Sequence, residues 1–311
     1  MIGSHVGRPR ASSAGTPVRA VSCTAAAGAS AQAAGEVAER IYRQELEGSG
    51  ARADQQQVER YAPLLRALAG EDRAAVRESV TQLVFSHTHI VRLRVISNRG
   101  LSVDVGGPYV IAPVAGVLRL HGRVVGRYLL SVQDDVGYLK LETRFVGVPV
   151  ALSAGGRELP LEGTARVAEA NLAEHTRLTY RGKSVESYSF AARAFPAGRL
   201  RVTVLVPPAR GAATVSCAAI RASELGVIAR RIWGRYALAS APPATIVNAI
   251  GRLTGGLAYV RAGSARLASS GRPWPSALPT IGTTSFRGRG YEVTSFAATV
   301  SLRPVRVYVL F

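Results

Sequence analysis

Arginine and tyrosine side chains recur along the central part of the sequence, on segments that alternate like β-strands. Val91, Leu93 and Val95 alternate with Arg92 and Arg94, so in a strand the two sets occupy opposite faces. An arginine fork binds carboxylate or phosphate through two hydrogen bonds, and tyrosine rings can wall a pocket. A solvated sheet face is the alternative for any single arginine. We expect a small-molecule site, and the candidate ligand-binding residues are Arg92, Arg94, Tyr109, Arg127, Tyr128, Gln133, Asp134, Asp135, Tyr138 and Lys140.

Asp134 and Asp135 lie in a segment, 133–137, that is expected to turn and is flanked by Tyr128 and Tyr138. Adjacent residues of an extended chain point in opposite directions, so both carboxylates cannot serve one acid–base reaction. Aspartate in a turn most often accepts hydrogen bonds from backbone amides. We favour that structural role, and a place in the ligand pocket is the alternative for one of the pair.

Histidines and cysteines offer little further chemistry. His87 and His89 would share a face of a strand and could bind a metal with His121 or an aspartate, but a pair without a third ligand is favoured, so no metal site or cofactor is predicted. Cys23 and Cys217 each follow Val-Ser, and they are too few for a disulfide framework. The sequence does not decide whether they pair.

Motifs typical of enzymes are missing from the sequence. It contains no phosphate-binding G-x-x-x-x-G-K-[ST], no H-E-x-x-H, no G-x-S-x-G and no G-x-G-x-x-G between a strand and a helix. We therefore expect a protein that binds rather than catalyses.

The net charge of +19 suggests a nucleic-acid partner at first sight. Lys140 and Lys183 are the only lysines among 39 basic residues, and the arginines are spread along the whole chain. Nucleic-acid binding needs a continuous basic stripe with stacking aromatics, and aromatic residues make up only 6% of the sequence. A basic nucleic-acid-associated protein is thus an alternative, and no nucleic-acid partner is expected.

The sequence repeats itself. The segments 35–42 and 226–233 share Gly, Ala, Arg and Ile in register and end in an aromatic residue, with helical spacing. The segments 180–192 and 286–298 share Arg-Gly, Glu and Ser-Phe-Ala-Ala, and each leads into an alternating strand. Residues 150–159 parallel 258–267 as a strand, a glycine turn and a second strand. The predicted repeat is a helix followed by two hairpins.

An additional block separates the first helix from its hairpins. Helical spacing with a break at Gly70 predicts two short helices over 58–85. Alternating residues then predict antiparallel strands from residue 89 to 132, and a last strand over 138–145. Helices that precede meandering strands indicate an α+β fold with helices against one sheet face.

Two phrases in this block, GGPYVIAPVAG at 106–116 and GRVVGRYLLSVQDDVGY at 122–138, resemble PDC/Cache sensor domains of the actinobacterial kind. The resemblance implies tandem PAS-like modules with antiparallel sheets and N-terminal helices, small-molecule binding and an extracytoplasmic location. The Tyr, Arg, Trp, Tyr, Asp series of amino-acid-binding members is not found here.

The organisation expected from these observations has four parts. Residues 1–34 form a disordered or leader segment without the apolar core of a signal peptide, and 35–145 form a helix with the first Cache-like module. Residues 146–210 form a second, truncated module, and 215–311 a helix with the repeated module. The expected function is sensory binding of a small ligand, with an anion as one option, without an output domain in this chain and with a signalling partner. The alternative is a structural or protein-interaction module with a vestigial pocket.

Overall fold

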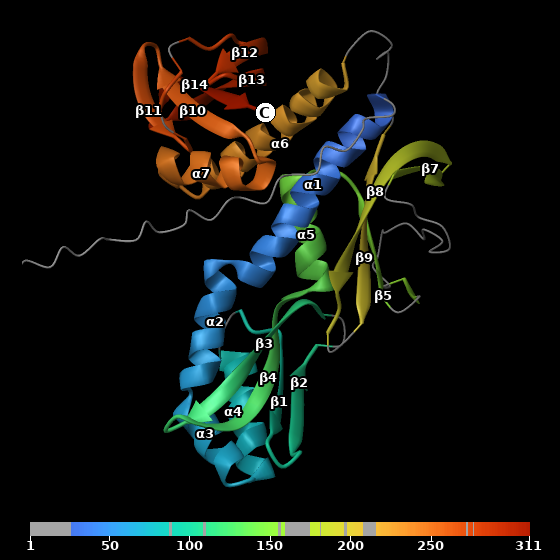
Figure 1. Cartoon of the computed structure of the whole chain (residues 1–311), viewed down its shortest axis with the longest axis vertical. Helices are drawn as coiled ribbons and strands as arrows, with labels where there is room; N and C mark the ends of the chain where they lie inside the picture. Colours follow the sequence, from blue (N-terminus) through green and yellow to red (C-terminus); the bar gives the residue numbers. More distant parts are fainter. Residues whose placement is uncertain are drawn as a thin grey trace, which may run out of the picture.

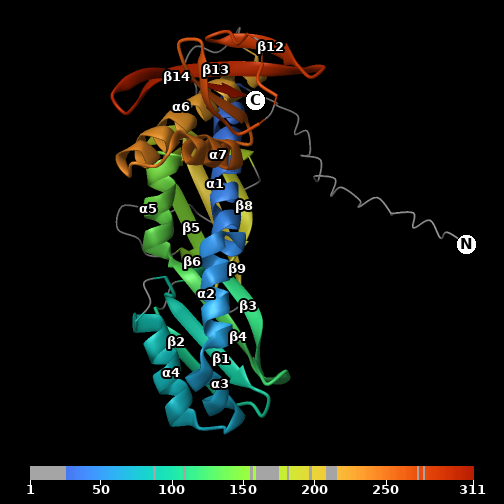
Figure 2. The same ribbon diagram turned by 90° about the vertical axis from the view of Figure 1, so that its left-hand side faces the viewer.

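The fold is known from a computed structural model of the chain. It describes residues 26–86, 89–107, 110–154, 157–158, 175–180, 182–195, 198–207, 216–271, 273–275 and 277–311. Helices and three antiparallel sheets confirm the predicted α+β class. The sheets follow one another along the long axis of the molecule (Figures 1 and 2).

The first sheet, sheet A, has four strands in the order β2-β1-β4-β3. They are β1 (Arg92–Ser97), β2 (Ser102–Gly106), β3 (Val110–Leu120) and β4 (Arg123–Asp134). Helices α2 (Ser49–Arg60), α3 (Ala62–Ala69) and α4 (Arg73–Ser86) cover one face and close a core of their own with it. Gly70 ends α3, which confirms the break predicted between two short helices.

Sheets B and C have five strands each and the same order. Sheet B reads β6-β5-β9-β8-β7, and sheet C reads β11-β10-β14-β13-β12. The strands of sheet B are β5 (Val150–Ala154), β6 (Arg157–Glu158), β7 (His175–Tyr180), β8 (Lys183–Arg193) and β9 (Arg199–Val206). Those of sheet C are β10 (Leu257–Ala262), β11 (Ala265–Ser269), β12 (Gly282–Phe286), β13 (Arg289–Val300) and β14 (Arg303–Leu310). The predicted hairpins of the repeat are confirmed.

Four helices lie between sheets B and C. They are α1 (Ala26–Glu47), α5 (Asp135–Phe145), α6 (Cys217–Leu238) and α7 (Pro243–Thr254). One continuous core joins them to the inner faces of both sheets. Helix α1 runs along sheet B and beside α6, and it continues through α2 towards sheet A (Figures 1 and 2).

Two expectations about domain limits need correction. Residues 26–34, expected within a leader, form the first turns of α1, and Ala29, Ala31, Ala33 and Ala34 are at most 1% exposed. An alanine-rich segment looks like a linker in sequence, but small side chains allow packing on several sides. The second module is not truncated, because sheet B has as many strands as sheet C.

The strand expected over 138–145 is instead helix α5. Asp134 is its N-cap, and its side chain accepts a hydrogen bond from the Gly137 amide at 2.5 Å. The buried positions Asp135, Tyr138, Glu142 and Phe145 follow the helical period. The alternation that suggested a strand was too short to distinguish the two periods.

The glycine shared by the two repeated helices has a physical cause. A Cβ on Gly35 of α1 would overlap the ring of Tyr188 on β8. A Cβ on Gly226 of α6 would lie 2.7 Å from the Thr294 side chain on β13. Both helices therefore approach their sheets at equivalent points. Glycine is required there because a Cβ would overlap a side chain of the facing strand.

Replacing Gly35→Ala should destabilise the protein by about 1–3 kcal/mol, because overpacking against Tyr188 outweighs the gain in helix propensity. The matched control is Gly234→Ala on α6, where no atom lies within 4 Å of the added Cβ. That variant should gain roughly 0.5–1 kcal/mol. Urea unfolding of both variants checks this, and equal stability of the two would contradict the close approach.

Candidate ligand-binding cleft

The predicted arginines of β1 are engaged with a neighbouring carboxylate. Arg92 Nε and Nη2 each donate to Asp104 of β2 at 2.9 Å, and Arg94 Nη2 donates to it at 2.7 Å. Partial burial raises the pKa of Asp104, but these hydrogen bonds outweigh it, so the pKa is lowered. Both guanidiniums also lie over the Phe195 ring, at 4.6 and 5.6 Å from its centroid. This cluster fixes the end of β8 against sheet A.

Tyr128 lies on the opposite face of sheet A from these arginines. It pairs with Val95 across β4 and β1, whereas Arg94 pairs with Leu129. Its ring is in the core under the helices, and its hydroxyl donates to Glu59 of α2 at 2.8 Å. Burial, and then this hydrogen bond, raise the pKa of Tyr128. Tyr128 therefore stabilises the packing of α2 on sheet A.

The other predicted residues are dispersed. Asp134 and Asp135 accept hydrogen bonds from backbone amides at the start of α5, which agrees with the role favoured from sequence, and Gln133 precedes them. Because α5 is a helix, Tyr138 is fully buried while Lys140 is exposed. Arg127 is exposed on the arginine face of sheet A, and Tyr109 lies outside the described residues. The nine that the structure describes are divided between the two faces of sheet A, the end of β4 and helix α5, and the role of all ten in ligand binding stays a prediction.

A cleft of about 1020 Å³ lies where α1, sheet A and the β8–β9 hairpin meet. Its size is that of a small-molecule site. Helix α1 forms one wall, the arginine face of sheet A a second, and the end of the hairpin a third. The lining residues are Glu39, Tyr42, Arg43, Leu46, Glu47, Pro113, Ala115, Leu129, Ala191, Ala192, Arg193, Ala194, Gly198 and Arg199.

Arg193 and Arg199 are the distinctive charges of the cleft. They are directly opposite each other at the end of β8 and β9, and both are exposed. Like charges in this position destabilise a hairpin. Neither forms an ion pair with any residue in the described part of the chain, whereas Arg43 is paired with Glu39 at 2.5 Å. Two unpaired guanidiniums suit a carboxylate or phosphate.

Tyr42 connects the cleft to the core. The Arg193 amide donates to its hydroxyl at 2.7 Å, and this hydroxyl donates to the Arg193 carbonyl at 3.4 Å. Its ring packs edge-on against Tyr138, with centroids 6.3 Å apart. A movement of the hairpin would therefore be transmitted to α1 and α5.

Arg193 and Arg199 directly flank the predicted strand segments 180–192 and 200–206, and for that reason they were not among the residues predicted to bind a ligand. The available signal was the pair of arginines at the two ends of a predicted hairpin turn. Tyr42, which is hydrogen-bonded to Arg193, was noted in the sequence only as the aromatic residue that ends a repeated helical segment.

The third module, formed by α6, α7 and sheet C, has a smaller cleft of about 320 Å³ at the equivalent place. In the repeat, Trp233 takes the place of Tyr42, and Thr299 that of Arg193. Its lining contains no ionisable side chain. The two modules have a cleft at equivalent positions, and of these two clefts the one beside sheet B is lined by arginines.

A buried carboxyl group lies behind Tyr42 and Tyr138. Glu142 of α5 is 0% exposed, and neither of its carboxyl oxygens has a hydrogen-bond partner of normal geometry among the described residues. Burial raises the pKa of Glu142 to about 8, which the nearby Tyr138 hydroxyl lowers only in part and Glu45 raises further. The group is therefore protonated at neutral pH.

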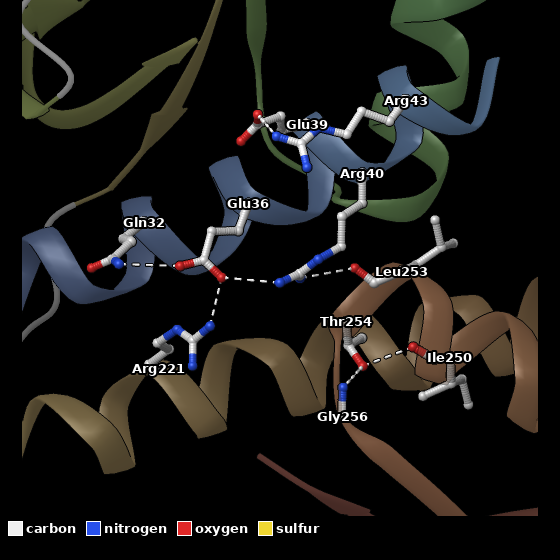
Figure 3. Close-up of polar contacts among 10 residues, drawn as sticks. All are labelled: Gln32, Glu36, Glu39, Arg40, Arg43, Arg221, Ile250, Leu253, Thr254 and Gly256. Atoms are coloured by element: carbon white, nitrogen blue, oxygen red, sulfur yellow. Dashed lines mark hydrogen bonds and ion pairs between the residues drawn. The ribbon is translucent and has the colours of Figure 1, made fainter. Parts of the chain in front are cut away.

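Helix α1 is linked to the third module by a polar cluster around Glu36 (Figure 3). Glu36 accepts hydrogen bonds from Gln32 at 3.1 Å, Arg40 at 3.4 Å and Arg221 of α6 at 2.5 Å. Arg40 also donates to the Leu253 carbonyl at the end of α7, at 3.2 Å. A cation near a helix C-terminus also interacts favourably with the helix dipole.

Metal and thiol chemistry adds two observations. No group of three His, Cys, Asp or Glu residues suited to a metal occurs within the described ranges, and His87 lies outside them. Cys217 is disulfide-bonded, and Cys23, the other cysteine of the sequence, lies outside the described residues. Within those residues no helix is long and apolar enough to span a bilayer.

Neither a family model nor a curated protein matches this chain. Solved structures do. The ligand-binding domain of the Pseudomonas fluorescens chemoreceptor CtaA in complex with L-alanine is 12% identical, with a TM-score of 0.33, and covers 56% of this chain and 94% of that one. The ligand-binding domain of the Pseudomonas aeruginosa PAO1 amino acid chemoreceptor PctB in complex with L-Arg is 11% identical, with a TM-score of 0.29, and the covered shares are 60% and 94%.

The Vibrio cholerae LuxQ periplasmic domain is 12% identical, with a TM-score of 0.18, and covers 91% of this chain and 97% of that one. These structures are ligand-binding domains of chemoreceptors and a periplasmic domain. At these TM-scores no ligand or contact residue of theirs is transferred to this chain.

The Glu142 carboxyl makes stability depend on pH. Its folded-state pKa of about 8 lies above the ordinary value of 4.5, so its stabilising contribution is complete below pH 4.5 and is lost as the pH rises through 8. Burial also raises the pKa of Glu45, which acts with the same sign. The free energy of unfolding should therefore fall between pH 5 and 8, by at most about 1.4 kcal/mol per unit from this group.

The variant Glu142→Gln should flatten that slope and be more stable than the wild type at pH 8. Glu47 is exposed, so the control variant Glu47→Gln should keep the pH dependence of the wild type. Urea unfolding at pH 5, 6, 7 and 8 measures the free energy of unfolding of each variant. An unchanged slope in Glu142→Gln would show that this carboxyl is not the protonated group.

The Glu36 cluster gives a second prediction. Glu36→Gln removes both ion pairs and leaves Arg40 and Arg221 facing each other, so stability should fall by about 1–3 kcal/mol. The control Glu39→Gln breaks the more exposed pair with Arg43 and should cost less than about 0.5 kcal/mol. Thermal unfolding compares them, and equal losses would mean that the cluster does not join α1 to α6.

Proposed function

We propose that the protein is a small-molecule-binding sensory module, and that an anionic ligand binds in the cleft between α1, sheet A and the β8–β9 hairpin. The observation that carries the proposal is the opposed pair Arg193 and Arg199, which form no ion pair with the described residues and lie in a cleft of ligand size. A carboxylate bridging both guanidiniums would replace repulsion with charge-assisted hydrogen bonds. Pro113, Ala115 and Leu129 would contact the apolar part of the ligand.

Ligand binding has a direct route to the rest of the molecule. Neutralising the arginine pair draws the end of the hairpin towards the cleft, and the Arg193 backbone is hydrogen-bonded to Tyr42 of α1. Helix α1 in turn holds α6 and α7 through Glu36 and Arg40. In this proposal a partner protein recognises the small displacement of α1.

The disulfide of Cys217 supports an extracytoplasmic location. Disulfides persist in oxidising compartments and are rare in the cytosol of most organisms. We place the module outside the cytoplasmic membrane on this ground, together with the sequence resemblance to extracytoplasmic sensors.

The second candidate function is a structural or protein-interaction module. It is favoured by one observation, that the space between sheet A and its helices is filled by side chains such as Leu64, Leu83 and Tyr128. Among the described residues this face of sheet A is occupied by a packed core, so the proposed ligand site is the cleft on the other face.

A thermal-shift screen with amino acids and organic acids separates the two functions. A ligand at a hundred times its Kd stabilises the protein by about 2.7 kcal/mol. We expect at least one acid to raise the Tm of the wild type, and the double variant Arg193→Gln, Arg199→Gln to lose that response.

The matched control is Arg99→Gln, which removes an exposed arginine from the turn between β1 and β2. It should respond like the wild type. A response retained by the double variant would place binding elsewhere, and a panel without any stabilising acid would favour the interaction module.

A further inference from the structure

Three arginines form a row on the outer face of sheet C, away from the cleft. Arg266 of β11 pairs with Arg261 of β10, which pairs with Arg306 of β14 on its other side. Neighbouring strands lie about 4.8 Å apart, so the three backbone positions span about 10 Å. The row is part of a module that the proposed ligand cleft does not involve.

No carboxylate neutralises this row within the described ranges. None of the three arginines takes part in an ion pair there, although like charges opposite each other destabilise a sheet. The equivalent row of sheet B reads Glu158, Ser153 and Arg201, in which the charges balance. The excess of positive charge is therefore particular to sheet C.

An aromatic side chain holds two of the guanidiniums. Those of Arg261 and Arg266 lie 5.9 and 5.8 Å from the centroid of the Trp274 ring, and Arg261 Nη2 donates to the Pro275 carbonyl at 2.8 Å. Arg306 Nη1 donates to Ser295 at 3.2 Å. The row is preorganised, which lowers the cost of binding an anion. The arginine row thus combines unbalanced charge with guanidiniums that the Trp274 ring, the Pro275 carbonyl and Ser295 hold in place.

We propose that the Arg266–Arg261–Arg306 row binds a compact phosphate-bearing anion, such as a diphosphate group. A carboxylate has two oxygens and one negative charge, whereas a diphosphate presents more oxygens and more negative charge over the span of all three guanidiniums. The binding face is separate from the cleft of sheet B, so it adds a second, chemically distinct anion site.

Inorganic pyrophosphate is the probe. Trp274 contacts the row and the sequence has one other tryptophan, so the Trp233→Phe variant reports Trp274 fluorescence alone. We expect a saturable fluorescence change with pyrophosphate and none with sodium chloride of equal ionic strength. Calorimetric titration of the wild-type protein gives the same affinity without relying on that variant.

Arg306→Gln and Arg266→Gln should each weaken pyrophosphate binding about tenfold or more. The control Arg252→Gln, exposed on α7, should leave it unchanged. The proposal is overturned if pyrophosphate and sodium chloride act alike, or if Arg306→Gln binds as tightly as Arg252→Gln.

Discussion

The close packing of helix α1 on two sides is the constraint on which the rest of the structure depends. Its alanines and Gly35 let it approach sheet B, and its other faces contact α6 and α7. Residues 29–35 of α1 are buried on every side, and a helical segment without an exposed polar face must be surrounded by protein. The third module therefore completes the burial of α1, and the continuous core between sheets B and C is its consequence.

Charge on α1 then determines what the helix can transmit. Glu36 and Arg40, in the middle of the helix, reach α6 and the end of α7, while Tyr42, two residues after Arg40, reaches the hairpin beside the cleft. Cleft and third module are thus joined by a few polar contacts on one rigid element. The repeated modules diverge where function would require it: arginines line the cleft of sheet B and the outer face of sheet C, and neither set recurs in the other sheet.

Much of the fold could be predicted from sequence because the two copies of the repeat form the same elements. The shared phrases at 180–192 and 286–298 correspond to equivalent strands, and the shared glycine to equivalent helix–sheet contacts. The predictions for residues 26–34 and for 138–145 were wrong. Small residues in a buried helix resemble a linker, and a short alternation of apolar residues fits either a helix or a strand. The cleft escaped prediction because Tyr42 and Arg193, far apart in sequence, meet only through packing.

Native-state hydrogen exchange in rising urea tests most directly whether α1 unites the modules. Amides of one cooperative unit share one opening free energy. If α1 holds both sheets, the slowest amides of α1, β8, β9 and α6 will converge on a single value. Opening of α6 and sheet C at clearly lower urea than α1 and sheet B would contradict the account.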